Sequence, residues 1–268
     1  MLDLHCHILP GIDDGPADMA ESLRMARRAV LDGITAAVAT PHTGNGAYNN
    51  SLEIVLTGIA RLKESLKEAG IPLKLYPGAE VHLVARLSEK INRREIATIN
   101  RSRYLLVELP GVLLLDSCKA ELFNLRLQGF VPIIAHPERQ AHFQKNPESL
   151  GEMVEMGILA QVTAQSLLGD FGSKIQRCAE KMLKNRLATI LASDAHGAEN
   201  RAPVLAEAVN RATKLLGNRA EAKALAGGTP RAIVADEKII PHHPVVETKS
   251  LGNIFARNIN KIFASTSF

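Results

Sequence analysis

Short apolar runs alternate along this chain with longer stretches in which apolar residues recur at helical spacing. Seven of the apolar runs have the length and composition of buried β-strands. The predicted strands are Leu2–Ile8, Thr35–Thr40, Leu73–Val81, Tyr104–Glu108, Val131–Ala135, Leu159–Thr163 and Ala188–Ser193. Helices are predicted over 17–32, 51–69, 117–128, 147–156, 173–185 and 203–216. This alternation is typical of a parallel sheet wound with helices, and about seven units favour a barrel over an open sheet.

The stretch 51–69 illustrates the helix signals. Ser51 is a suitable N-cap, because its hydroxyl can accept a hydrogen bond from the first free backbone N–H groups. Gly70 ends the pattern, and Pro72 follows where a helix cannot continue.

The length of 268 residues allows one α/β barrel domain, which we place at 1–240. The composition changes after Pro241, so 241–268 is interpreted as a separate C-terminal tail. Apolar residues within 250–268 predict an amphipathic helix. This helix is expected to pack on its own body or on a sister subunit, which would make a homo-oligomer; binding to a membrane surface is the alternative.

The composition indicates where the protein is located and which ligands it could bind. No apolar run reaches the roughly 18 residues that a membrane-spanning helix needs, and the N-terminus has no signal-peptide pattern. Three irregularly spaced cysteines fit a reducing compartment, so a cytoplasmic location is expected. The net charge is +4, but the basic residues are spread along the chain, which is typical of a solvated surface; a basic bias would also favour an anionic substrate. Absence of Trp and scattered basic residues argue against nucleic acid.

The first strand carries two histidines at strand spacing. Side chains alternate across a strand, so His5 and His7 share one face while Cys6 points the other way. Two imidazoles on one face can bind a single metal ion. Alone, this pattern is weak evidence for a metal site, and the alternative is two surface or core histidines that bind no metal.

Other predicted strands also stop at a histidine or a carboxylate. These residues are His42, Glu80, Glu108, His136, Asp194 and His196. The C-terminal strand ends of a barrel face one common site, and a metal compensates for burying such groups. Mixed nitrogen and oxygen ligands suit Zn, Mn or Fe. The sequence therefore predicts a metal centre.

The loop 9–16 after the first strand is rich in glycine and proline. Its fixed turn would aim Asp13 or Asp14 back at the strand end. The alternative is an ordinary turn in which both aspartates serve as caps.

Cysteine-based phosphatase chemistry is excluded by spacing, because it needs an arginine six residues after the nucleophile. The residues six places after Cys6, Cys118 and Cys178 are Ile12, Asn124 and Lys184.

The complete set of motifs resembles the polymerase and histidinol phosphatase (PHP) superfamily. Residues 5–16, 39–42 and 135–139 look like those of the manganese-dependent tyrosine-protein phosphatases of bacterial capsule and exopolysaccharide operons. The resemblance covers roughly 1–235 and departs at Cys6, where a small hydroxyl residue is expected. It implies a distorted (β/α)7 TIM-like barrel. It also implies a cytoplasmic enzyme that dephosphorylates the phosphotyrosine tail of a polysaccharide-synthesis autokinase and meets the membrane only through that partner.

Carried over residue by residue, the resemblance implies three divalent ions, with Mn favoured and Fe or Zn as alternatives. The first would be held by His5, His7, Glu80 and Asp194. The second would be held by Glu80, Glu108 and His136, with Glu80 bridging. The third would be held by Asp14, His42 and His196, with Asp13 as the alternative to Asp14. Arg139 would meet the phosphate with help from Arg201; the alternative for Arg139 is a surface salt bridge.

Three other functions stay open at this point. A histidinol-phosphatase-like enzyme for small phosphate esters has similar ligands, but the loop 9–16 favours the protein-tyrosine branch. A nuclease-type member of the superfamily is disfavoured by the low aromatic content of 4%. The third alternative is a non-catalytic scaffold that holds metal.

Overall fold

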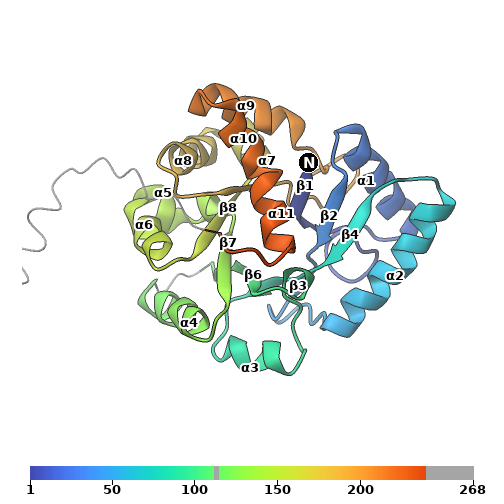
Figure 1. Ribbon diagram of the computed structural model, residues 1–268, viewed down its shortest axis with the longest axis horizontal. Helices are drawn as coiled ribbons and strands as arrows, with labels where there is room; N and C mark the ends of the chain where they lie inside the picture. The colour runs from blue at the N-terminus through green and yellow to red at the C-terminus, as the bar shows by residue number, and fades with distance from the viewer. Residues whose placement is uncertain (112–114, 240–268) are drawn as a thin grey trace, which may run out of the picture.

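Parallel strands surrounded by helices form the body of the protein in a computed structural model that describes residues 1–111 and 115–239 (Figure 1). The strands are β1 (Leu2–Cys6), β2 (Ala36–Ala39), β3 (His42–Thr43), β4 (Lys74–Pro77), β5 (Glu80–His82), β6 (Tyr104–Glu108), β7 (Val131–Ala135), β8 (Leu159–Thr163) and β9 (Ile190–Ala192). The longer helices are α1 (Met19–Leu31), α2 (Leu52–Glu68), α4 (Leu115–Leu127), α6 (Glu148–Glu155), α8 (Ser173–Lys184) and α9 (Ala206–Leu216). Shorter helices are α3 (Leu87–Asn92), η1 (Ile99–Arg101), η2 (Pro137–Arg139), α5 (Ala141–Lys145), α7 (Ala164–Leu168), α10 (Arg219–Leu225) and α11 (Gly228–Val234).

Two sheets join into a distorted barrel. One has the order β1-β2-β4 and the other β3-β5-β6-β7-β8-β9, with every strand pair parallel. β2 and β3 follow each other closely, as do β4 and β5, so each couple acts as one bent strand shared between the sheets. At the other seam, the Asp194 N–H donates to the His5 carbonyl at 2.8 Å, and the His7 N–H donates to the Ala195 carbonyl at 2.9 Å. The predicted α/β barrel of seven strand units is confirmed.

The barrel has an inner and an outer apolar core. Inward-facing side chains such as Leu4, Leu106 and Ile133 fill the interior, and Ile233 of α11 packs against them at one end. In Figure 1, α11 lies across the middle of the ring of strands. The outer core lies between the strands and the surrounding helices. This packing leaves the opposite end of the barrel, where the strands terminate, for polar side chains.

An irregularity in β1 brings its two histidines to that end. The pairing of β1 with β2 changes register between Asp3 and Cys6. Leu2 and Leu4 belong to the inner core, whereas Cys6 belongs to the outer core. A bulge of this kind re-aims the following side chains, so His5 and His7 also face inward.

Every predicted strand and helix within the described residues is present, with three differences. The short strand β3 was not predicted. The single predicted strand Leu73–Val81 is two strands, β4 and β5, separated by Gly78. Several short helices, including α10 and α11, were not predicted. The predicted helix within 250–268 lies outside the described residues. Among the helices that are described, none has the length and apolar character required to cross a membrane.

Candidate metal centre

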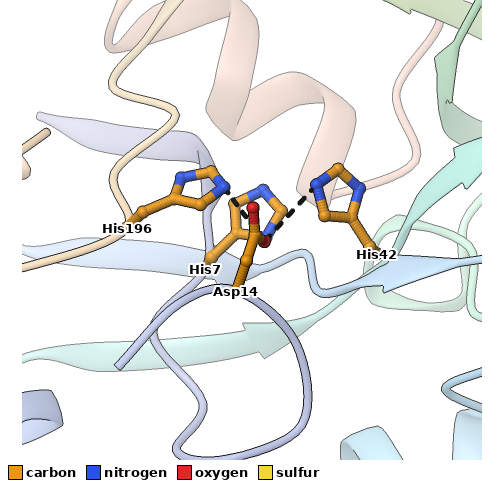
Figure 2. Close-up of side chains that lie close together, drawn as sticks. All are labelled: His7, Asp14, His42 and His196. Carbon is orange, nitrogen blue, oxygen red and sulfur yellow. Dashed lines mark ion pairs between the residues drawn. The ribbon is translucent and has the colours of Figure 1, made fainter. Parts of the chain in front are cut away.

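The candidate ligands form one cluster, and on one side of it three histidines at strand ends lie together with an aspartate from the loop 9–16. His7, Asp14, His42 and His196 offer ligand atoms that all lie within 4.8 Å of one another. Figure 2 shows Asp14 between the rings of His42 and His196. Its Oδ1 atom lies 3.5 Å from His42 Nε2 and 3.3 Å from His196 Nε2. Three of these residues, Asp14, His42 and His196, are the predicted third ligand set. The fourth, His7, was predicted for the first set.

Glu80 lies at the middle of the whole cluster and is buried. Its Oε2 atom is 3.3 Å from His5 Nε2, 3.3 Å from His7 Nε2 and 3.1 Å from His42 Nδ1. Its other oxygen, Oε1, is 2.7 Å from His136 Nε2. Four imidazoles therefore converge on the two oxygens of one carboxylate, a position suited to a ligand that bridges ions.

The deepest group consists of His5, His7, Glu80 and Asp194, all of them buried. The Nε2 atoms of His5 and His7 are 3.1 Å apart, and Asp194 Oδ1 lies 3.2 Å from His5 Nε2. Two ligands on one ion with bonds of roughly 2.1 Å have a separation of this order. The arrangement corresponds to the predicted first ligand set.

Glu108 completes a third group, and here the arrangement differs from the prediction. His42, Glu80 and Glu108 have ligand atoms within 4.8 Å of one another. The predicted second set contains His136 in place of His42. In the structure His136 approaches the opposite oxygen of Glu80, so His42 lies between two candidate ion positions.

Neighbouring groups fix which ring nitrogen faces the cluster. His5 Nδ1 lies 2.9 Å from Gln161 Oε1, and His7 Nδ1 lies 2.7 Å from Asp13 Oδ2. His196 Nδ1 donates to the Asp194 carbonyl at 3.0 Å. Each contact leaves Nε2 free as the ligand atom, a standard arrangement around metal-bound histidines.

Gln161 was missed from the sequence, although a signal was present. It is a fully buried polar residue in the middle of the apolar strand β8. β8 is also the one predicted strand that does not end in a histidine or carboxylate. A buried polar side chain needs a partner, so its position facing the site could have been inferred.

The two aspartates of the loop 9–16 have different surroundings. Asp13 accepts hydrogen bonds from the backbone N–H groups of Gly15 and His42, at 3.0 and 3.1 Å, in addition to its contact with His7. Asp14 has a side chain that is 48% exposed and reaches two histidine rings. These contacts favour Asp14 as the ligand and Asp13 as the residue that orients His7.

Both predicted arginines meet at Asp194. Arg139 Nη2 lies 2.6 Å from Asp194 Oδ2 in an ion pair, and Arg201 Nη2 donates to the same oxygen at 2.7 Å. Their side chains are 23% and 33% exposed. Arg139 is therefore partly buried beside the cluster rather than in a surface salt bridge.

The electrostatics of the cluster favour cations. Burial opposes charge on Glu80, but the rings of His5 and His136 hold the pKa of its carboxyl well below the usual range. Burial likewise opposes charge on His7, but Asp13 and Glu80 raise the pKa of this ring to about 10. Burial and the nearby charge of His7 lower the pKa of His196 to about 3. Without metal, the carboxylates thus depend on protonated histidines for compensation.

Unpartnered atoms show that the residues present fit divalent ions. Glu80 Oε2 and His196 Nε2 are buried, and no hydrogen-bond partner for them exists among the described residues. Both face the cluster, where an ion would satisfy them. The nitrogen and oxygen donors suit Mn, Fe or Zn.

A pocket of about 440 Å³ opens beside His196 and Asp14. Arg24 and Glu21 of α1, together with Arg201, form part of its wall. A larger pocket of about 770 Å³ between α2 and the segment 91–102 includes none of the candidate site residues. Of these two pockets, the smaller one therefore reaches the cluster, at Asp14 and His196.

A parallel barrel with histidine and carboxylate ligands at its strand ends is the architecture of a metal-dependent hydrolase. Comparison with known families identifies the particular branch: this chain belongs to the capsular polysaccharide synthesis family CpsB/CapC, whose sequence model matches residues 1–234.

Known relatives give the same result. The chain is 37% identical to the tyrosine-protein phosphatase YwqE of Bacillus subtilis over 201 residues, which cover 75% of this chain and 79% of YwqE. It is 30% identical to the tyrosine-protein phosphatase CpsB of Streptococcus pneumoniae over 244 residues, covering 89% of this chain and 100% of CpsB.

Solved structures also match. A crystal structure from work on YwqE and CpsB, described as unique metal-dependent tyrosine phosphatases, superposes with a TM-score of 0.87 at 33% identity, covering 91% of this chain and 98% of the other. The histidinol phosphate phosphatase of Lactococcus lactis superposes with a TM-score of 0.52 at 15% identity, covering 81% and 93%. This second likeness shows a shared fold alone.

Proposed function

We propose that this protein is a metal-dependent protein-tyrosine phosphatase that acts on the phosphotyrosine tail of a polysaccharide-synthesis autokinase. The observation that carries the proposal is the convergence of four imidazoles on both oxygens of buried Glu80. Family membership and the similarity to tyrosine phosphatases over most of the chain support the reaction class.

Three Mn²⁺ ions are proposed as the cofactors, with Fe or Zn as alternatives. The proposed ligands are His5, His7, Asp14, His42, Glu80, Glu108, His136, Asp194 and His196. When bound, such ions lower the pKa of water so that it attacks at neutral pH, and they neutralise phosphoryl oxygens. Asp13 and Gln161 hold the rings of His7 and His5 in the tautomers that present Nε2.

The two arginines are proposed to bind the phosphoryl group. Arg139 and Arg201 lie on the same edge of the cluster, and guanidinium groups offer paired N–H donors to phosphoryl oxygens. Water oxygen then bonds to phosphorus as the bond from phosphorus to the tyrosyl oxygen breaks, giving inorganic phosphate and tyrosine. A tyrosyl leaving group with a pKa of about 10 needs little protonic help.

The extent of the catalytic domain is part of the proposal. We assign 1–240 to the phosphatase domain, since the family match ends at residue 234 and α11 ends at Val234. The tail 241–268 is assigned no part in the chemistry. The enzyme is proposed to work in the cytoplasm and to reach the membrane only through the kinase.

A direct test combines metal analysis with substrate comparison on the full chain. Purified protein should contain Mn, Fe or Zn and should hydrolyse a phosphotyrosyl peptide much faster than histidinol phosphate. His5→Ala should lose both metal and activity. His142→Ala is the matched control, because His142 bonds to Ser149 outside the cluster and should keep both. Metal-loaded protein that prefers histidinol phosphate would refute the proposal and favour the small-ester phosphatase.

A further inference from the structure

The face of an aromatic ring lies against Arg139. Phe171 belongs to the short loop between α7 and α8, and the guanidinium carbon of Arg139 is 4.5 Å from the centre of its ring. Asp194 Oδ2 is 2.6 Å from Arg139 Nη2. The guanidinium is thus held by a ring and by a carboxylate of the candidate metal centre.

The loop is built to fix the position of Phe171. Gly169 and Gly172 have φ angles of 101° and 93°, a region that favours glycine, and the Gly172 N–H donates to the Gly169 carbonyl at 2.9 Å. A Cβ atom on Gly169 would lie 3.2 Å from the amide of Gln176. That amide donates to two carbonyls at the end of α7, at 3.2 Å each. The loop between the two helices is therefore closely constrained.

Arg139 still has unused hydrogen-bonding capacity. Its Nη2 atom is engaged by Asp194, but its Nε atom is buried and has no hydrogen-bond partner within residues 1–111 and 115–239. Unsatisfied buried donors are costly, so they are rare unless a ligand uses them. Nη2 faces Asp194, which places this side of the guanidinium at the edge of the metal centre.

We propose that Phe171 is a positioning residue for the phosphatase reaction. Its ring holds the plane of the Arg139 guanidinium, so that the N–H groups not paired with Asp194 meet the phosphoryl group of the substrate. The proposal rests on the proposed function. Phe171 carries no charge and no hydrogen-bonding group with which to bind the phosphoryl group itself, whereas its ring contacts Arg139, which does. Without the ring, Arg139 regains rotamer freedom that must be lost again when phosphate binds.

A double-mutant cycle on the full-length, Mn-loaded protein tests this coupling. Phe171→Leu should lower kcat/KM for a phosphotyrosyl peptide about tenfold, which corresponds to about 1.4 kcal/mol and lies within the range of a partly desolvated cation–π contact. It should weaken binding of inorganic phosphate by a similar factor, measured by calorimetry. Phe171→Tyr keeps a ring and should stay within about threefold of wild type.

The decisive comparison is made in the Arg139→Ala background. There, Phe171→Leu should have almost no further effect on phosphate affinity or on kcat/KM, because the group that it positions is gone. Phe123→Leu is the matched control: Phe123 is 45% exposed on α4 and should change neither quantity. Metal content should equal that of wild type in every variant.

Equal losses from Phe171→Leu with and without Arg139 would overturn the proposal, as would wild-type phosphate binding in Phe171→Leu. If Phe171→Leu does not fold, Phe171→Met gives the same test with an apolar side chain that has no ring face. A wild-type protein that binds phosphate but does not hydrolyse the peptide would refute the proposed function alone, and the phosphate affinities would still decide the role of Phe171. A wild-type protein that binds no phosphate would overturn both.

Discussion

Replacing Asp13 by Asn should weaken metal binding although Asp13 is not a proposed ligand. Its Oδ2 atom accepts from the His7 ring at 2.7 Å and from the His42 N–H at 3.1 Å, and its Oδ1 atom accepts from Gly15 at 3.0 Å. Burial raises its pKa, but the hydrogen bond and charge of His7, together with the backbone hydrogen bonds from Gly15 and His42, outweigh burial and hold the pKa below the usual value. Asp13 is therefore charged at neutral pH and linked to two candidate ligands.

The size of the effect follows from these contacts. Asn turns a charge-assisted hydrogen bond into a neutral one, a difference of about 1 kcal/mol. Asn also has one oxygen where Asp13 has two, so one of the three donors loses its acceptor at a cost of about 1–2 kcal/mol. Together these changes, about 2–3 kcal/mol, predict a loss of roughly 30- to 150-fold in metal affinity, near the upper end of the range known for residues that orient metal ligands.

Calorimetric titration of Mn²⁺ into metal-free protein at one fixed pH measures this loss. Asp14→Asn should behave differently: it should lower the number of ions bound, since Asp14 belongs to one ligand set. Asp18→Asn is the control, because Asp18 caps α1 by accepting from Glu21 at 2.8 Å and Asn caps equally well. Wild-type affinity in Asp13→Asn, with the fold intact, would refute the orienting role.

Three further results are expected. Chelator-treated protein should lose phosphatase activity and regain it best with Mn²⁺. Full activity in metal-free protein would refute the metal-dependent mechanism. Burial raises the pKa of the Cys178 thiol to about 11 and that of Cys6 well above the usual range, so thiolate is scarce at neutral pH. A variant with Ser at Cys6, Cys118 and Cys178 should therefore keep its activity within about tenfold, and a larger loss in folded protein would contradict this. Arg139→Ala should lower kcat/KM about 100-fold or more with metals in place, and Arg139→Lys should restore part of it; an unchanged value would remove Arg139 from the mechanism.

The strands were predictable because apolar runs of the right length alternate with helical periodicity, but their bending was not. Leu73–Val81 reads as one strand, yet the chain turns at Gly78 from one sheet to the other. A Cβ atom on Gly78 would lie 2.7 Å from the Val38 side chain, so the close approach of neighbouring strands requires glycine there. This contact forms only in the assembled barrel, so the hydrophobic periodicity of the sequence does not reveal it.

The short helices near the C-terminal end of the described chain were missed for a related reason. α11 begins with Gly228, Thr229 and Pro230, which read as a turn in isolation. Its Ile233 nevertheless packs into the inner core of the barrel. Tertiary packing, rather than local propensity, stabilises a helix of this length.

For the candidate site, the residue types were predictable and their pairing was not. Strand ends in a barrel converge, which is why His5 and Glu80 could be expected near each other. The sequence does not fix which histidine approaches which oxygen of Glu80. That choice depends on strand register, and it accounts for His42 being found beside Glu108 where His136 was predicted. Gln161 was not predicted because it lies inside strand β8, whereas the predicted site residues were those at the ends of strands.

Backbone conformation explains why the site depends on the whole barrel. His136, Asp194 and Arg201 have φ angles of 33°, 53° and 52°, which non-glycine residues seldom adopt and which cost about 1–3 kcal/mol each. His136 also precedes Pro137, which disfavours helical backbone at the preceding residue. These turns allow His136 to reach Glu80, and Arg139 and Arg201 to reach Asp194. Glycine would relieve the strain at each position but would remove the functional side chain, so packing elsewhere must stabilise the strained turns. Ions that bind only the folded state would stabilise it and so offset part of the free-energy cost of the strained turns. The stability of the barrel should therefore depend on the occupancy of its metal centre.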